Sequence, residues 1–181
     1  SAFAAYQNTN FTILMGFDVF GSAEIEFQNQ SSDEDTDVGF TPGIEGRFHL
    51  QKEISLGLGA RYQVPRERDE PDADEFSFLP VYGIFQFNVP TTSEISFGLL
   101  VHLGYNFLFC DFDNLEKKIG VSKLEAEGGF YWGVGARITL ANNISIEALY
   151  NVNYGEITSN QISQDADLTY TKLTLAVGYS F

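Results

Sequence analysis

The sequence has no long hydrophobic run, a single cysteine and few positive charges. No stretch approaches about 18 consecutive apolar residues, which excludes a membrane-spanning helix. Cys110 is the only cysteine, so an internal disulfide is excluded as well. The net charge is −15, with 10 lysines and arginines against 25 aspartates and glutamates. This balance excludes docking to nucleic acid or to an anionic membrane through a basic patch.

Aromatic side chains and regular alternation are what the sequence does contain. It has 17 phenylalanines and 9 tyrosines, while charged residues make up 19%, below the usual value of about 25%. Many aromatics with few charges are typical of a barrel wall that carries aromatic girdles at the membrane interfaces. At 181 residues the chain suffices for one domain or one closed barrel.

The clearest alternation lies at the C-terminal end. Leu173, Leu175, Val177, Tyr179 and Phe181 share one face of an extended strand. The other face is small or polar and carries Lys172, Thr174, Ala176, Gly178 and Ser180. A soluble sandwich would instead show water a row of charged and hydroxyl side chains. The pattern therefore favours a barrel wall with lipid outside and a packed polar lumen inside.

Seven further segments alternate in the same way and precede the strand at 168–181. They span residues 11–27, 38–50, 54–64, 76–88, 95–109, a segment that ends at 140, and 144–154. In the segment 11–27 we expect Ala23 to face outward and Glu24 to face inward. In the segment 76–88, Pro80 predicts a bulge or an irregular rim. Long polar connections alternate with short turns. The sequence therefore predicts an all-β fold, an eight-stranded antiparallel up-and-down transmembrane β-barrel at residues 11–181 after an N-terminal extension at 1–10.

The inward faces of these strands carry a small set of charged side chains. We expect this lumen charge network to consist of Asp18, Glu45, Arg47, Arg61, His102, Arg137, Glu147 and Lys172. Arg137 and Glu147 are equally distant from a hairpin near residue 142, so they should face each other across neighbouring strands. Glu45 and Arg61 lie close by the same counting, and the charges are nearly balanced. The network predicts either a self-neutralising plug or, through exchange of pair partners, a narrow gated pore.

The long connections carry most of the acidic residues. The acidic loops contain Asp33, Glu34, Asp35, Asp37, Asp69, Glu70, Asp72 and Asp74. Val38 stands where an EF-hand needs glycine, and the final glutamate is missing, so we predict a solvated anionic surface and no metal site. Divalent ions that bridge these loops or neighbouring lipopolysaccharide are the alternative. His49 and His102 are the only histidines, and we expect no catalytic site, no cofactor and no enzymatic activity.

Three short sequences carry a resemblance to a known family. They are Leu-Ala-Val-Gly-Tyr-Ser-Phe at 175–181, Gly-Leu-Gly-Ala-Arg-Tyr at 57–62 and Gly-Val-Gly-Ala-Arg-Ile at 133–138. With the alternating loop lengths, the chain resembles the small eight-stranded outer-membrane barrels, the family of outer membrane proteins A and X. In such proteins Leu175, Val177, Tyr179 and Phe181 would form the signal that the barrel-assembly machinery recognises. Full-length outer membrane protein A has a peptidoglycan-binding domain after the barrel, whereas this sequence stops at the last strand.

The resemblance implies a location and a set of partners. It implies a monomer in the bacterial outer membrane, with extracellular loops and with short turns and both termini in the periplasm. The partners implied are outer-membrane lipid and lipopolysaccharide, the assembly machinery during insertion and a surface ligand held by the loops, but no nucleic acid. The implied role is envelope integrity, adhesion or another surface interaction.

Two further interpretations concern the N-terminus and the phase of the strands. Ser1 to Ala5 looks like the small-residue end of a signal peptide cleaved after Ala4, or alternatively like an ordinary N-terminal extension. A soluble lipocalin-like carrier barrel is a rival fold, but it requires an apolar interior, and the phase of the strands places the polar side chains inside. A narrow pore for small solutes is the rival function.

Overall fold

The protein is a single closed β-barrel. The computed structural model describes residues 9–27, 30–36, 38–65, 76–89, 95–110, 124–140, 143–159 and 166–181. The N-terminal residues 1–8, with the predicted end of a signal peptide, lie outside this range. In the described residues the strands are β1 (Thr9–Phe27), β2 (Gln30–Thr36), β3 (Gly39–His49), β4 (Ile54–Arg61), β5 (Phe76–Val89), β6 (Ser96–Cys110), β7 (Leu124–Thr139), β8 (Ile144–Ser159) and β9 (Ala166–Ser180).

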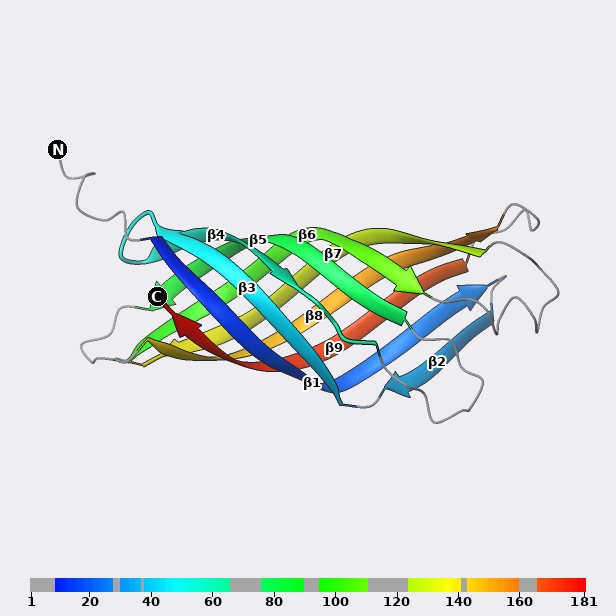
Figure 1. Ribbon diagram of the computed structural model, residues 1–181, viewed down its shortest axis with the longest axis horizontal. Helices are drawn as coiled ribbons and strands as arrows, with labels where there is room; N and C mark the ends of the chain where they lie inside the picture. Colours follow the sequence, from blue (N-terminus) through cyan, green and yellow to red (C-terminus); the bar gives the residue numbers. More distant parts are fainter. Residues whose placement is uncertain are drawn as a thin grey trace.

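The sheet closes where the first and last long strands meet. All pairings are antiparallel, and each strand from β3 to β8 pairs with the next. β1 pairs with both β3 and β9. At the seam the backbone N–H of Phe181 donates to the carbonyl of Phe11 over 2.9 Å, and Phe11 donates back over 3.2 Å. The predicted eight-stranded up-and-down barrel is confirmed. The start of β1 and the end of β9 lie at one end of it, here called the terminal end (Figure 1).

β2 is a strand that the sequence did not predict. Gly21 pairs with Thr36 of β2 and Asp18 pairs with Gly39 of β3, so β2 and β3 lie end to end along β1 in one register. Asp33, Glu34 and Asp35 therefore belong to a strand, and their predicted place in a loop is wrong. Side-chain alternation could not show this, because the sequence of β2 contains no apolar residue and strands can pair through backbone hydrogen bonds alone.

A bulge in β1 reverses the facing of the residues beyond it. The register with β9 shifts between Asp18 and Phe20. One extra residue turns every following side chain to the opposite face, and Ala23 is accordingly buried while Glu24 is exposed. The predicted facing of both residues is therefore wrong.

Pro80 does not produce the predicted bulge. The β5–β6 register runs without a shift, with Pro80 opposite Asn106. The nitrogen of Gln63 donates to the carbonyl of Phe78, and hydrogen-bonded pairs recur at every second residue, so the nitrogen of Pro80 faces β4. The missing donor coincides with the end of β4 at Arg61.

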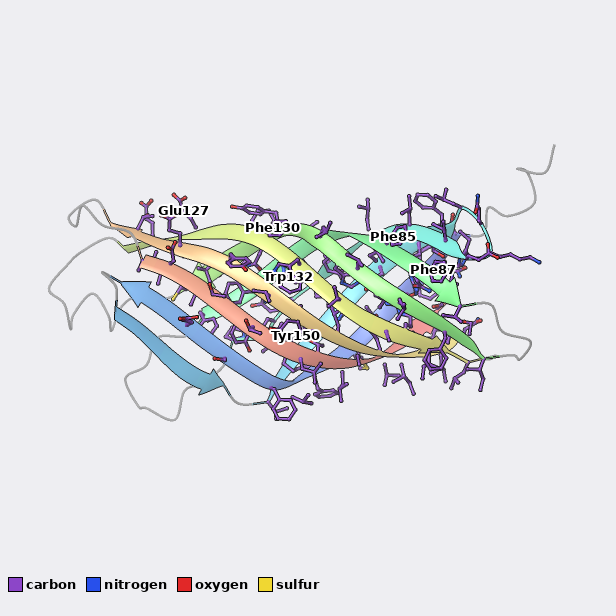
Figure 2. All side chains as sticks on the ribbon, turned by 180° about the vertical axis from the view of Figure 1, so that it is seen from behind. Phe85, Phe87, Glu127, Phe130, Trp132 and Tyr150 are labelled. Atoms are coloured by element: carbon purple, nitrogen blue, oxygen red, sulfur yellow. The ribbon has the colours of Figure 1, made fainter. Side chains whose placement is uncertain are left out.

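The outer surface is apolar with aromatic side chains toward both ends. The exposed aromatics near the terminal end are Phe11, Phe48, Phe87, Phe97 and Tyr179. Those near the opposite end are Phe40, Tyr62, Tyr105, Phe107, Phe109, Phe130 and Tyr154. Figure 2 shows Phe85 and Phe130 pointing away from the wall. Between the two groups the exposed side chains include the aliphatic Ile44, Leu58 and Val134 as well as the aromatic Phe85 and Tyr150. This is the surface expected of a barrel that sits in a lipid bilayer.

Within the described ranges, no helix is long and apolar enough to cross a membrane.

Candidate functional site: the lumen and its mouth

The structure places all eight predicted charged and histidine residues inside the barrel. Each of them is at least nine-tenths buried. They come from β1 and every strand from β3 to β9 except β5. Alternation along each strand is what turns them inward, since every second side chain faces the lumen.

Five of these side chains form one group, here called the ion cluster. Its members are Glu45, Arg47, Arg61, Arg137 and Glu147. The register places Arg137 directly opposite Glu147, and the two form an ion pair. The Nη2 atom of Arg61 lies 3.0 Å from Glu45 Oε1 and also binds Glu147. Glu147 is thus shared by two guanidinium groups that project from different strands.

The ion cluster spans the lumen rather than lining one side of it. Arg137 on β7 reaches Glu45 on β3, with Nη2 and Oε2 2.6 Å apart. Arg61 on β4 likewise reaches Glu147 on β8. Neither pair lies on neighbouring strands. These contacts therefore tie opposite walls together across the interior.

Tyr82 and His102 pack against the ion cluster. The Tyr82 hydroxyl donates to Glu45 Oε1 over 3.0 Å and accepts from Arg61 Nε over 2.8 Å. The His102 ring stacks on Tyr82 with centroids 4.4 Å apart. A Cβ at Gly59 would lie 2.7 Å from the Tyr82 ring, so the glycine provides the space for this tyrosine. The sequence analysis did not include Tyr82 among the site residues. Its position on the same strand face as Gln86 could have indicated that it points into the lumen.

Asp18 and Lys172 form a second polar group farther from the terminal end. Lys172 Nζ lies 3.0 Å from Asp18 Oδ2 and also donates to Gln63 over 3.0 Å. Thr41 and Thr174 each donate a hydroxyl hydrogen bond to the same carboxylate, over 2.7 and 2.6 Å. These contacts join β1, β3 and β9.

The lumen beyond Lys172 contains an apolar cluster, which the sequence did not predict. The outer apolar cluster consists of Ala23, Phe76, Phe78, Leu108, Leu168 and Tyr170. The rings of Phe78 and Tyr170 stack with centroids 5.7 Å apart, and neither side chain is exposed. The cluster was missed because the bulge in β1 turns Ala23 inward and because Phe76 and Phe78 begin a strand with weak alternation.

A polar mouth opens at the terminal end. A cavity of about 600 Å³, here called the vestibule, is lined in part by Arg47, His49, Lys52 and Glu53. A continuous belt of hydrogen bonds runs along part of its lining and passes in order through Ser180, Thr12, Arg47, Gln86, Asn88, Ser55, His49 and Asn10. Arg47 belongs to both the belt and the ion cluster, so it lies at the boundary between the vestibule and the interior.

The remaining predicted residues lie elsewhere. Leu175, Val177, Tyr179 and Phe181 are all exposed on the outer surface. Asp37, Asp69, Glu70, Asp72 and Asp74 lie outside the described residues. No group of three or more His, Cys, Asp or Glu side chains that could hold a metal ion occurs in the part of the chain that the structure describes.

Comparison with known proteins identifies the family. The family described as "Outer membrane protein beta-barrel domain" matches residues 1–181. The chain belongs to this family. Membership places the protein in the bacterial outer membrane, in agreement with the prediction. A search of the curated proteins found no match.

Solved structures of other members of this architecture share the fold at low sequence identity. Ail, the attachment invasion locus protein of Yersinia pestis, has a TM-score of 0.56 at 15% identity and covers 95% of this chain and 98% of its own. OprG from Pseudomonas aeruginosa has a TM-score of 0.59 at 14% identity, over 97% of each chain. Neisserial surface protein A has a TM-score of 0.53 at 14% identity, over 94% of this chain and 97% of its own.

Proposed function

We propose that this outer membrane protein has a closed lumen and acts through an acidic outer end that binds a surface ligand. The observation that carries the proposal is the filling of the lumen. Arg137 and Glu147 are at most 1% exposed, and the outer apolar cluster lies between them and the opposite end. An eight-stranded barrel has an interior just wide enough for side chains, so such filling leaves no continuous water path for ions.

The orientation that we propose puts the terminal end in the periplasm. The connections 50–53, 90–95 and 140–143 lie at this end and are short, whereas those at the opposite end include the longer segments 62–75 and 111–123. Barrels of the outer membrane have short periplasmic turns and longer extracellular loops.

Labelling of intact cells tests this orientation. In a Cys110→Ser background, we expect a membrane-impermeant maleimide to react with Asp72→Cys in intact cells and with Lys52→Cys only after the outer membrane is permeabilised. The reverse order of labelling would contradict the orientation.

The ligand that we propose is cationic. The segment 66–75 holds six acidic residues and two arginines, so the outer end attracts positive charge. Ail has been solved in complex with the heparin analogue sucrose octasulfate, an anion that this surface would repel. Divalent cations shared with lipopolysaccharide would act in the same way. We propose a binding role without enzymatic activity.

Binding of a cationic peptide tests the surface role. With the protein in nanodiscs, we expect oligolysine to bind at low ionic strength and the affinity to fall roughly tenfold when Asp69, Glu70, Asp72 and Asp74 are changed to amides. The control is Glu53→Gln at the terminal end, which should leave the affinity unchanged. Equal affinity for the wild type and the amide variant would contradict the proposal.

A gated narrow pore is the second candidate, and one observation favours it. Arg61 and Arg137 each contact both Glu45 and Glu147. Each arginine could therefore release one glutamate and keep the other. Opening the network in this way would leave no buried charge unpaired, and an unpaired buried charge is what makes opening costly. Measurement of conductance separates the two candidates.

A further inference from the structure

The ion cluster carries one more positive than negative charge. Three guanidinium groups, on Arg47, Arg61 and Arg137, face the two carboxylates of Glu45 and Glu147. Arginine stays protonated in proteins, so the excess is not removed by titration of these groups. Asp18 and Lys172, the other charged pair buried in the described lumen, are of opposite sign and do not offset it. A buried charge of this kind requires a counter-ion.

Donor groups of the same residues have no acceptor in the protein. Arg61 Nη1, Arg137 Nη1 and Arg47 Nε are buried donors that make no hydrogen bond. The two ring nitrogens of the adjacent His102, one a donor and one an acceptor in the neutral ring, make none either. Arg47 Nε is 3.7 Å from Glu45 Oε2, which is too long for a hydrogen bond. Unpaired polar atoms at this density are unusual in a folded interior. They gather around the excess positive charge, because His102 stacks on the tyrosine that bridges Arg61 and Glu45.

We propose that the ion cluster binds one small monovalent anion of halide size. The spare N–H groups of Arg61 and Arg137, beside His102, would hold it. Water could satisfy the hydrogen bonds but not the excess charge, so an anion fits both observations. The anion is monovalent because the excess is one charge, and it is small because these side chains leave almost no exposed surface. Arg47, the cluster member that lines the vestibule, marks the route from the terminal end. The site goes beyond the proposed surface role and does not depend on it.

Thermal unfolding of detergent-folded protein tests the site. Gluconate is replaced stepwise by chloride at constant ionic strength, and unfolding is followed by the loss of the compact band on a gel. We expect a saturable rise of about 4 °C in the midpoint, because an ion that binds only the folded state stabilises it. Arg47→Gln makes the ion cluster neutral and should abolish the rise. Thr9→Glu changes the net charge equally at an exposed position and should retain it.

Two outcomes would overturn the proposal. One is a wild-type midpoint that does not depend on chloride, and the other is an equal loss of the rise in Thr9→Glu and Arg47→Gln. Crystals grown in bromide provide a test that needs no variant. An anomalous peak in contact with the guanidinium groups of Arg61 and Arg137 would support the site, and a lumen without such a peak would also overturn it.

Discussion

At the scale of single residues, Glu147 holds the ion cluster together. Its carboxylate binds both Arg61 and Arg137. Glu147→Ala leaves two guanidinium groups with less compensation, and loss of one partner from a buried network typically costs about 3–5 kcal/mol. We expect this decrease in the free energy of unfolding in lipid vesicles, measured by urea titration.

The matched control for Glu147 is a glutamate on the outside of the neighbouring strand. Glu127 lies on β7, is exposed, and is seen toward the end opposite the terminal end in Figure 2. Glu127→Ala should change the free energy of unfolding by no more than about 0.5 kcal/mol. Equal destabilisation by both substitutions would contradict a special role for the ion cluster.

Sequence reasoning found the members of this cluster but only part of its pairing. Alternation turns the charged residues inward, and counting from a hairpin places Arg137 opposite Glu147. The contacts of Glu45 with Arg137 and of Arg61 with Glu147 join strands that are not neighbours. They depend on how the closed sheet tilts and curves, which no local pattern encodes.

At the scale of elements, the approach of β5 and β6 requires a glycine at position 104. A Cβ there would lie 2.1 Å from the carbonyl oxygen of Val81 and 2.6 Å from Tyr82 Cα. Gly104→Ala must push the strands apart beside the tyrosine, so we expect a loss of about 1–3 kcal/mol in the free energy of unfolding.

Gly83 on the neighbouring strand provides the comparison. Its nearest contact would be the carbonyl oxygen of Leu103, 3.7 Å from an added Cβ, which is an ordinary distance. Gly83→Ala should therefore cost much less than Gly104→Ala in the same urea titration. If the two substitutions lower the free energy of unfolding equally, the close approach of β5 and β6 does not explain why position 104 is a glycine.

The eight barrel strands were predictable, whereas the local irregularities were not. Period-two alternation located β1 and β3 to β9, since each presents one face to lipid and one to the lumen. The bulge between Asp18 and Phe20 interrupts that period in β1. The sequence of β2 contains no apolar residue, so alternation could not mark it as a strand. The ladder of backbone hydrogen bonds stabilises both features without a side-chain signature.

At the scale of the whole molecule, the interior changes character along the barrel axis. A polar vestibule at the terminal end leads to the ion cluster, then to Asp18 and Lys172, and finally to the outer apolar cluster. The rival of a soluble carrier barrel required an interior that is apolar throughout. Here the buried apolar side chains form two separate clusters, the outer apolar cluster and a second one of Tyr82, Ile84, Leu100 and Tyr131, and share the interior with buried charged groups. Exposed apolar side chains, in contrast, lie on the outside of all eight barrel strands.

Planar-bilayer conductance of the folded protein tests the central claim, the closed lumen, most directly. Folding is first verified by a gel mobility that shifts on boiling. A closed lumen predicts that the wild type is electrically silent. It also predicts that folded Glu147→Ala shows no discrete single-channel openings. Reproducible single-channel steps in the wild type, altered by Glu147→Ala, would contradict this account and make the ion cluster a gate.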